Sequence, residues 1–171
     1  MSDQEIKSQL LTVTSLASDF CVALENARQS EKEEFIIEIL NCLPRLYWHF
    51  SDLAIDGFIP DSDFGMYPSY VDEDFYDAVR RNVETLLGED DVFLETFEED
   101  MKYSETPIAA SISECLADIF QSLYNFLSVV KESEGLQIEG SYMECRENFV
   151  AYWSQTLCNV MRALNHLRFN S

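Results

Sequence analysis

Glu114 and Asp118 lie one helical turn apart, a spacing at which a helix could offer two carboxylate oxygens to a metal ion. Metal centres in helical bundles also use histidine in a Glu-x-x-His pattern, and neither histidine of this chain has a glutamate three residues before it. The two carboxylates fall opposite the apolar line of their expected helix. We therefore interpret them as part of a solvated face and predict no metal and no other cofactor.

Nucleophilic catalysis lacks its usual components in this sequence. There is no Gly-x-Ser-x-Gly motif, and the only histidines that could act as a base are His49 and His166. Cys42 precedes His49 by seven residues, which along a helix is about 10 Å and too far for a hydrogen bond. A glycine-rich phosphate loop is also absent from the sequence. No catalytic residue is predicted.

Arg146 is a cation that helical phase places inside an apolar arc, beside Trp153 and Leu164. A charge in that position must be paired or must reach water. The sequence predicts a buried ion pair with an acid at the core edge, or exposure at the first turn of the helix. The alternative is an arginine that faces a ligand in a pocket at the end of the bundle.

The segment from Gly57 to Tyr76 combines aromatic and acidic residues in a way that could bind a partner. Aromatic side chains anchor protein interfaces, and acidic ones steer a basic partner toward them. The competing interpretation is a loop that buries its rings to seal the bundle, because large exposed apolar patches are rare. The candidate partner-binding residues are Phe64, Tyr67, Tyr70, Asp72, Asp74 and Tyr76.

The net charge of −21, from 32 acidic and 11 basic residues, limits the classes of partner. A field of this sign repels nucleic acids and anionic membrane surfaces, and it attracts basic proteins. We therefore expect no nucleic-acid or membrane partner, and a basic protein is the partner class that fits. Charge is also uneven, since 17 acidic and three basic residues lie between Asp52 and Glu105, whereas no acid follows Leu157.

Cysteine usage and the first residues favour a cytoplasmic protein. The five cysteines are scattered, odd in number and form no Cys-x-x-Cys pair, and four of them lie within or beside apolar helical stripes. The polar start from Met1 to Lys7 does not resemble a secretory signal, and no apolar run is long enough to span a membrane.

Apolar residues recur at helical spacing along most of the chain, which predicts an all-α fold in a single domain over residues 1–171. Four long helices and one or two shorter ones would form an antiparallel bundle. Ala54–Val71 reads as a loop that packs onto the helices, and Asp90–Met101 as a short amphipathic helix or turn. Thr106-Pro107 resembles a helix start, with threonine as the cap. The expected helices are Asp3–Ala27, Glu31–Leu53 with a kink at Pro44, Asp72–Leu87, Thr106–Lys131 and Ser141–Leu167.

Two stretches carry a family resemblance. They are FLETFEEDMKYSETPIAASISECLADIFQSLYNFL, Phe93 to Leu127, and CRENFVAYWSQTLCNVMRALNHL, Cys145 to Leu167. Both resemble the DUF5063 family, a bacterial family of short helical proteins catalogued as a domain of unknown function. The resemblance implies a compact all-helical fold and carries no activity to transfer.

The first functional hypothesis is a non-enzymatic interaction protein, such as an adaptor, inhibitor or immunity-type domain, that binds a basic protein surface. It depends on the charge, the aromatic segment and the absence of a catalytic motif. The alternative is a small-molecule-binding or metal-dependent enzyme that uses carboxylates in a bundle pocket.

Overall fold

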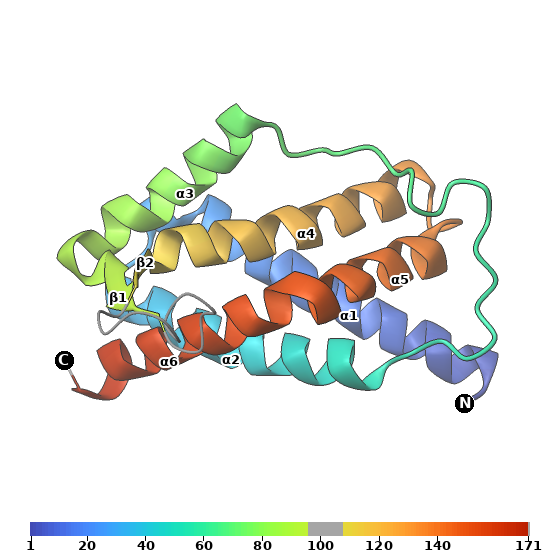
Figure 1. Cartoon of the computed structure of the whole chain (residues 1–171), viewed down its shortest axis with the longest axis horizontal. Coiled ribbons are helices and arrows are strands. Elements are labelled where there is room, and N and C mark those ends of the chain that lie inside the picture. The colour runs from blue at the N-terminus through green and yellow to red at the C-terminus, as the bar shows by residue number, and fades with distance from the viewer. Residues whose placement is uncertain (96–107, 171) are drawn as a thin grey trace.

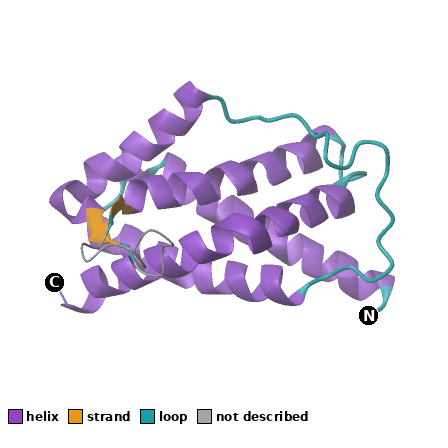
Figure 2. Cartoon of the chain, viewed as in Figure 1, coloured by secondary structure: helices purple, strands orange, loops and turns teal. Residues whose placement is uncertain are grey.

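The computed structural model describes residues 1–95 and 108–170, and it confirms the predicted bundle of packed helices (Figures 1 and 2). In the described residues, α1 (Asp3–Glu25) packs on α2 (Lys32–Asp52) and on α4 (Ile112–Glu132). Helix α3 (Glu73–Leu87) covers α4 from outside, and α5 (Ile138–Asn148) and α6 (Ser154–Asn170) complete the bundle against α4 and α2. The two chain ends lie at opposite ends of the long axis.

Capping residues set the starts of α1 and α3. Ser2 accepts a hydrogen bond from the Glu5 amide at 3.2 Å, and the Glu5 carboxylate accepts one from the Ser2 amide at 2.8 Å. This reciprocal pair satisfies two amides that have no partner within the helix. Asp72 caps α3 in the predicted way by accepting from the Phe75 amide at 2.8 Å. Gly88 ends α3 with a positive φ of 57°, which glycine adopts without a steric penalty.

Helix α2 continues through Pro44 as one helix, as predicted. The predicted Ser141–Leu167 helix begins three residues earlier, at Ile138, and contains a π-helical turn at Phe149–Trp153 between α5 and α6. Phe149 and Trp153 are both buried, so the two ends of this turn face the core, whereas Val150 and Tyr152 between them are exposed.

The segment before α4 differs from the predicted helices. Gly88–Asp91 forms a 3₁₀ turn (η2), and β1 (Val92–Leu94) then pairs antiparallel with β2 (Ala109–Ser111) in a small hairpin. The prediction of helix or turn over Asp90–Met101 is therefore wrong where β1 lies, and the rest of that span falls outside the described residues. The predicted Thr106-Pro107 start is outside them too, and α4 begins at Ile112.

Strand pairing explains this difference, because it satisfies backbone groups that a helical Ala109–Ser111 would have satisfied within the helix. Ser111 then caps α4 by accepting from the Glu114 amide at 3.1 Å. A serine followed three residues later by a glutamate is itself a helix-start pattern.

One aromatic cluster lies at the centre of the core. The Phe50 ring is 4.9 Å from the Trp153 ring and 5.2 Å from the Tyr142 ring, measured between centroids. Four of the five free cysteines are buried, and Cys158 is exposed. Among the described helices, none has both the length and the apolarity needed to cross a membrane.

Candidate functional site

A hollow of about 510 Å³ lies between the start of α3 and the outer face of α4, and we call it the acidic hollow. Its lining is Val71, Asp72, Glu73, Asp74, Tyr76, Asp77, Asp118 and Gln121. Four of these residues belong to the first turns of α3 and Asp72 is its cap, and carboxylates at this end also stabilise the helix dipole. The lining contains five carboxylates and no cation, so it can attract a positively charged group.

Tyr76 and Asp118 join the two walls of the acidic hollow. The Tyr76 hydroxyl donates a hydrogen bond to Asp118 at 2.7 Å. Desolvation raises the pKa of Tyr76, and the adjacent Asp118 carboxylate raises it further. Desolvation also raises the pKa of Asp118, although the hydrogen bond from Tyr76 opposes that rise. The tyrosine is therefore a neutral hydrogen-bond donor at ordinary pH.

The carboxylate pair considered in the sequence, Glu114 and Asp118, lies on the exposed face of α4. Asp118 is engaged by Tyr76. Within residues 1–95 and 108–170, no group of three or more His, Cys, Asp or Glu side chains is placed to hold a metal ion.

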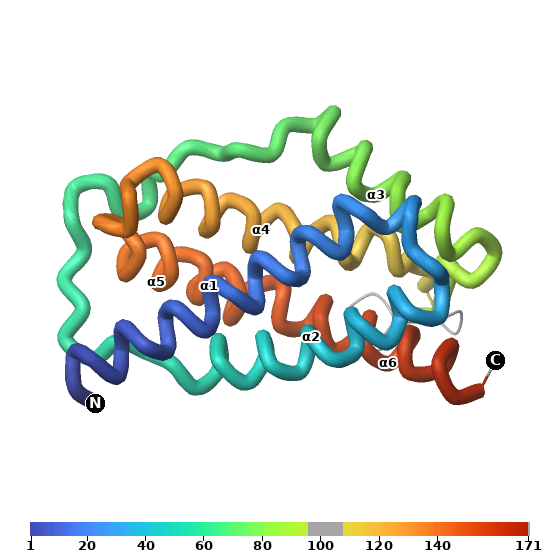
Figure 3. Tube along the Cα trace, turned by 180° about the vertical axis from the view of Figure 1, so that it is seen from behind, coloured from blue at the N-terminus to red at the C-terminus, as the bar shows by residue number. Residues whose placement is uncertain are grey.

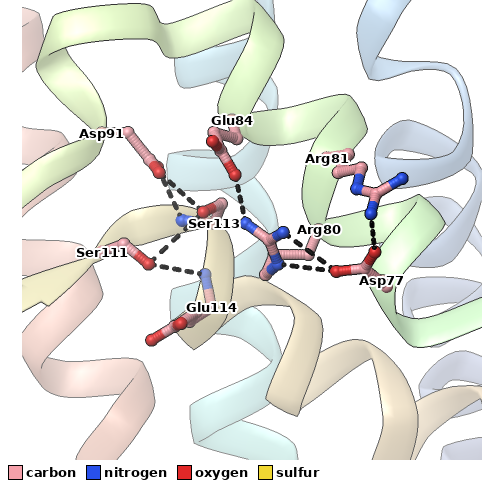
Figure 4. Close-up of polar contacts among 8 residues, drawn as sticks. All are labelled: Asp77, Arg80, Arg81, Glu84, Asp91, Ser111, Ser113 and Glu114. Atoms are coloured by element: carbon pink, nitrogen blue, oxygen red, sulfur yellow. Dashed lines mark hydrogen bonds and ion pairs between the residues drawn. The ribbon is translucent and has the colours of Figure 1, made fainter. Parts of the chain in front are cut away.

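The two arginines of α3 are neutralised within their own helix (Figure 4). Arg80 pairs with Asp77 at 2.9 Å and also with Glu84, and Arg81 pairs with Asp77 at 2.6 Å. In the described part of the chain, no cation forms an ion pair with Glu73 or Asp74. The negative charge at the start of α3 is therefore available to another molecule.

The chain between α2 and α3, Ala54–Tyr70, crosses one end of the bundle, and we call it the strap (Figure 3). It lies over the turn that joins α4 to α5, where Gln137 donates to Asp63 at 2.7 Å. Farther along, the Tyr70 amide donates to the Asn125 side chain of α4 at 2.7 Å. The Phe58 and Phe64 rings contact each other with centroids 5.5 Å apart. The strap is thus packed onto the helices, as predicted.

Gly140 of α5 allows a close fit between the strap and the bundle. A Cβ atom built on Gly140 would lie 2.2 Å from the Tyr67 hydroxyl oxygen, which is too close for any side chain. That hydroxyl is buried and has no hydrogen-bond partner in the described residues. Only glycine lets the Tyr67 ring lie this close to the helix.

The six predicted partner-binding residues separate into two groups. Phe64, Tyr67 and Tyr70 belong to the strap and are half-buried, so their rings mainly fasten it to the bundle. Asp72, Asp74 and Tyr76 belong to α3 and line the acidic hollow. Gln121 connects the two groups, because it lines both the acidic hollow and a neighbouring hollow of about 220 Å³ beneath Tyr67–Ser69.

Arg146 binds backbone carbonyl groups, a role the sequence did not predict. Its guanidinium donates to the Phe50 carbonyl at 3.0 Å and to the Ser51 carbonyl at 3.4 Å, at the end of α2. The Tyr142 hydroxyl donates to the Leu53 carbonyl at 2.6 Å in the same region. These carbonyls lack partners within the helix, and a cation there also interacts favourably with the helix dipole. Arg146 thus holds the end of α2 and the start of the strap in place.

Replacing Arg146 with methionine should lower the free energy of unfolding by about 1 kcal/mol, because the carbonyls at the end of α2 lose charge-assisted hydrogen bonds. Methionine keeps an unbranched apolar stem of similar length. Urea denaturation measures the change. The control is Arg45→Met, which changes an exposed arginine of α2 and should alter the free energy of unfolding little. A loss of stability no larger than that of Arg45→Met would show that the hydrogen bonds from Arg146 to the end of α2 are not needed.

Asp91 is an important buried residue that the sequence analysis missed. It is only 5% exposed, and its carboxylate accepts from the Ser113 amide at 2.7 Å and from the Ser113 hydroxyl at 2.6 Å (Figure 4). This carboxylate lies at the start of α4, where amides have no partner within the helix. Its role is to join η2 to α4. The only feature of the sequence that could have indicated this role is the position of Asp91, directly before the apolar residues of β1.

The chain should become more stable as the pH falls from neutral into the mildly acidic range. Desolvation raises the pKa of Glu25, Asp118 and Glu144 in the folded protein. Groups with raised pKa values take up protons more readily when folded, so they add stability as the pH drops toward their unfolded values near 4. The large negative charge is reduced at the same time. His49 opposes the trend, because burial lowers its pKa.

Thermal unfolding followed by circular dichroism at several pH values tests this expectation. The midpoint should rise between pH of about 7.5 and pH of about 5.5, with a smaller rise in Asp118→Asn, which has no carboxyl to protonate at that position. A midpoint that falls steadily over this range would contradict it.

Comparison with known proteins supports the architecture. The model of the family described as Domain of unknown function (DUF5063) matches residues 4–170. The fold also resembles the crystal structure of protein BF1032 from Bacteroides fragilis, with a TM-score of 0.79 and 29% sequence identity. That similarity covers 95% of this chain and 94% of that chain. Among curated proteins, none matches this chain.

The family match includes both stretches on which the resemblance was based, and it also extends over the N-terminal half of the chain. It also agrees with the helical fold that the resemblance implied. The chain belongs to the DUF5063 family.

Proposed function

We propose that this protein is a non-enzymatic interaction domain that binds a basic protein partner. The observation that carries the proposal is the acidic hollow, where five carboxylates surround a space of about 510 Å³. The arginines of α3 are occupied by Asp77 and Glu84, so they leave the first turn of the helix strongly negative. A surface of this kind attracts lysine- and arginine-rich segments and speeds their association.

The Tyr76 side chain adds specificity to this charge. It is half-buried, held by Asp118, and lines the acidic hollow. Tyrosine is enriched at the energetic centres of interfaces because it offers a large apolar ring and few freely rotating bonds. A guanidinium or ammonium group of the partner would therefore meet carboxylates and an aromatic ring together.

The test compares which proteins co-purify with tagged variants from cells of its own source, at low and high salt. Glu73→Gln with Asp74→Asn removes two charges from the acidic hollow and leaves the Asp72 cap intact. Glu33→Gln with Glu34→Gln is the matched control, because it removes two exposed charges from the first turn of α2. Both changes should cost similar stability through the helix dipole.

We expect a basic protein to bind the wild type and the α2 control at low salt, and to be lost at high salt and from the α3 variant. Equal recovery of the basic protein with the α3 variant and with the α2 control would show that the acidic hollow is not the binding site. Clean recovery of the domain without any partner at either salt would contradict an interaction function.

A further inference from the structure

The end of the bundle that the strap covers exposes apolar side chains to an unusual degree. Among the described large apolar residues, the three most exposed are Leu136 at 90%, Ile59 at 85% and Met66 at 80%. The next most exposed is Tyr152 in the π turn, at 73%. Single exposed apolar residues are ordinary, but three such residues on one strap-and-turn unit are not.

These residues belong to one local structure. Ile59 and Met66 are in the strap, and Leu136 is in the turn between α4 and α5. The bond from Gln137 to Asp63 holds the strap to this turn, and Figures 1 and 3 show the two segments side by side from opposite directions. We call Ile59, Met66 and Leu136 the apolar end.

Aromatic side chains packed on Gly140 and two glycine turns hold the apolar end in place. Phe58 lies 4.0 Å from the position of a Cβ on Gly140, and the Tyr67 ring packs on the same glycine. Gly65 and Gly135 adopt positive φ values of 80° and 84°, which fix the tight turns beside Met66 and Leu136. The exposure is therefore a property of a packed surface, and a partner would pay little entropy to order it.

Exposed carboxylates are frequent in the segments that carry the apolar end. Among the described residues, the exposed acids in the strap, in the turn and at the adjoining ends of α4 and α5 are Asp56, Asp61, Asp63, Glu132, Glu134 and Glu139. Lys131 is an exposed cation at the end of α4. An apolar centre with a charged rim is the usual composition of a protein interface, and here the rim is negative.

We infer that the apolar end is a docking surface for a cationic segment of another protein that also carries apolar side chains. This inference rests on the proposed function and names where the basic partner is anchored. The negative rim selects lysine and arginine, and the apolar end buries leucine-like side chains of the same segment. Gln121 lines both hollows along the strap, so one segment can reach from the acidic hollow toward this end.

Charge argues against two other occupants. A second copy would bring another net charge of −21 and the same negative rim to this surface. An anionic membrane surface would be repelled in the same way.

The probe for the test is a synthetic helical peptide with lysines on one face and leucines on the other, compared with a peptide in which serines replace the leucines. Binding is measured by fluorescence anisotropy. The variant Ile59→Ser/Met66→Ser/Leu136→Ser removes the apolar end. The matched control, Leu11→Ser/Val22→Ser/Tyr152→Ser, removes three exposed apolar side chains from α1 and the π turn.

We expect the lysine–leucine peptide to bind the apolar-end variant about tenfold more weakly than the wild type, because apolar anchors carry much of an interface's affinity. The control should bind within about twofold of the wild type, and the serine peptide should be insensitive to the apolar-end change. Amide shifts in NMR spectra of the wild type should be largest at residues 57–67 and 134–139. Equal peptide binding by the apolar-end variant and the wild type would overturn the inference.

Further measurements separate the other outcomes. A dimer in sedimentation equilibrium that the apolar-end changes abolish would overturn the inference in favour of self-association. Binding to phosphatidylserine vesicles that is lost in the same variant would overturn it in favour of a membrane surface. If the cellular partner is lost from Glu73→Gln/Asp74→Asn but kept by the apolar-end variant, this inference fails and the proposed function stands.

Discussion

Asp91→Ala is expected to lower the free energy of unfolding by about 3 kcal/mol, because it leaves the buried Ser113 amide and hydroxyl without their charged acceptor. The two hydrogen bonds are 2.7 and 2.6 Å long, and Asp91 is almost fully enclosed. Water cannot easily replace the lost oxygen atoms at this depth. Asp91→Asn should cost less, because the amide oxygen can still accept one of the bonds.

Urea denaturation of the purified variants measures this effect. The control is Asp90→Ala, one residue earlier, whose carboxylate forms a surface ion pair with Lys32. Exposed ion pairs contribute from nothing to about 1 kcal/mol, so the control should lose little. A loss for Asp91→Ala as small as that of Asp90→Ala would show that the join between η2 and α4 does not depend on this carboxylate.

The effect of Gly140→Ala on the free energy of unfolding is expected to depend on the residue at position 67. The substitution should destabilise the wild type and stabilise a Tyr67→Phe variant. In the wild type, the new methyl group meets the Tyr67 hydroxyl 2.2 Å away, and relieving such overpacking costs about 2 kcal/mol. In a Tyr67→Phe background the nearest remaining ring atom is 3.5 Å away, an ordinary contact. Alanine then stabilises the helix by up to about 1 kcal/mol relative to glycine.

Tyr67→Phe alone should raise the free energy of unfolding by about 1 kcal/mol, because it removes a buried hydroxyl that has no partner in the described residues. Thermal and urea unfolding of the four proteins in the double-mutant cycle gives the coupling between the two sites. Destabilisation by Gly140→Ala that is equal in both backgrounds would mean that the hydroxyl does not touch this glycine in solution.

The helical bundle could be predicted because the apolar period is unambiguous over most of the chain. Capping residues added correct boundaries, with Ser2 and Asp72 at helix starts and Gly88 at a helix end. The hairpin was missed for a specific reason. Ile108 and Ala109 continue the period of the following helix, so periodicity alone extended the helix backward over β2. The Ser111 capping pattern was the signal that could have corrected it.

Side-chain roles were less predictable, because they depend on tertiary contacts. The sequence marked Arg146 as unusual, and helical phase could not reveal that its partners are the carbonyls of a helix about a hundred residues earlier in the chain. Asp91 was one acid among many, and composition cannot tell which one is buried. In the strap, the sequence drew attention to the rings, whereas the structure half-buries the rings and exposes Ile59 and Met66.

The π turn at Phe149–Trp153 gives the last helix run an unusual tolerance to changes in length. A π turn holds one residue more than the α-helical turn it replaces. Removing one exposed residue there, such as Ala151, converts it to a regular turn and leaves Trp153 and all later residues on their original faces. The same deletion in the middle of α4 would rotate every following side chain by about 100° and turn its buried face toward water. Single-residue gaps among homologous chains should therefore be concentrated at this turn, and helix α4 should keep a constant length.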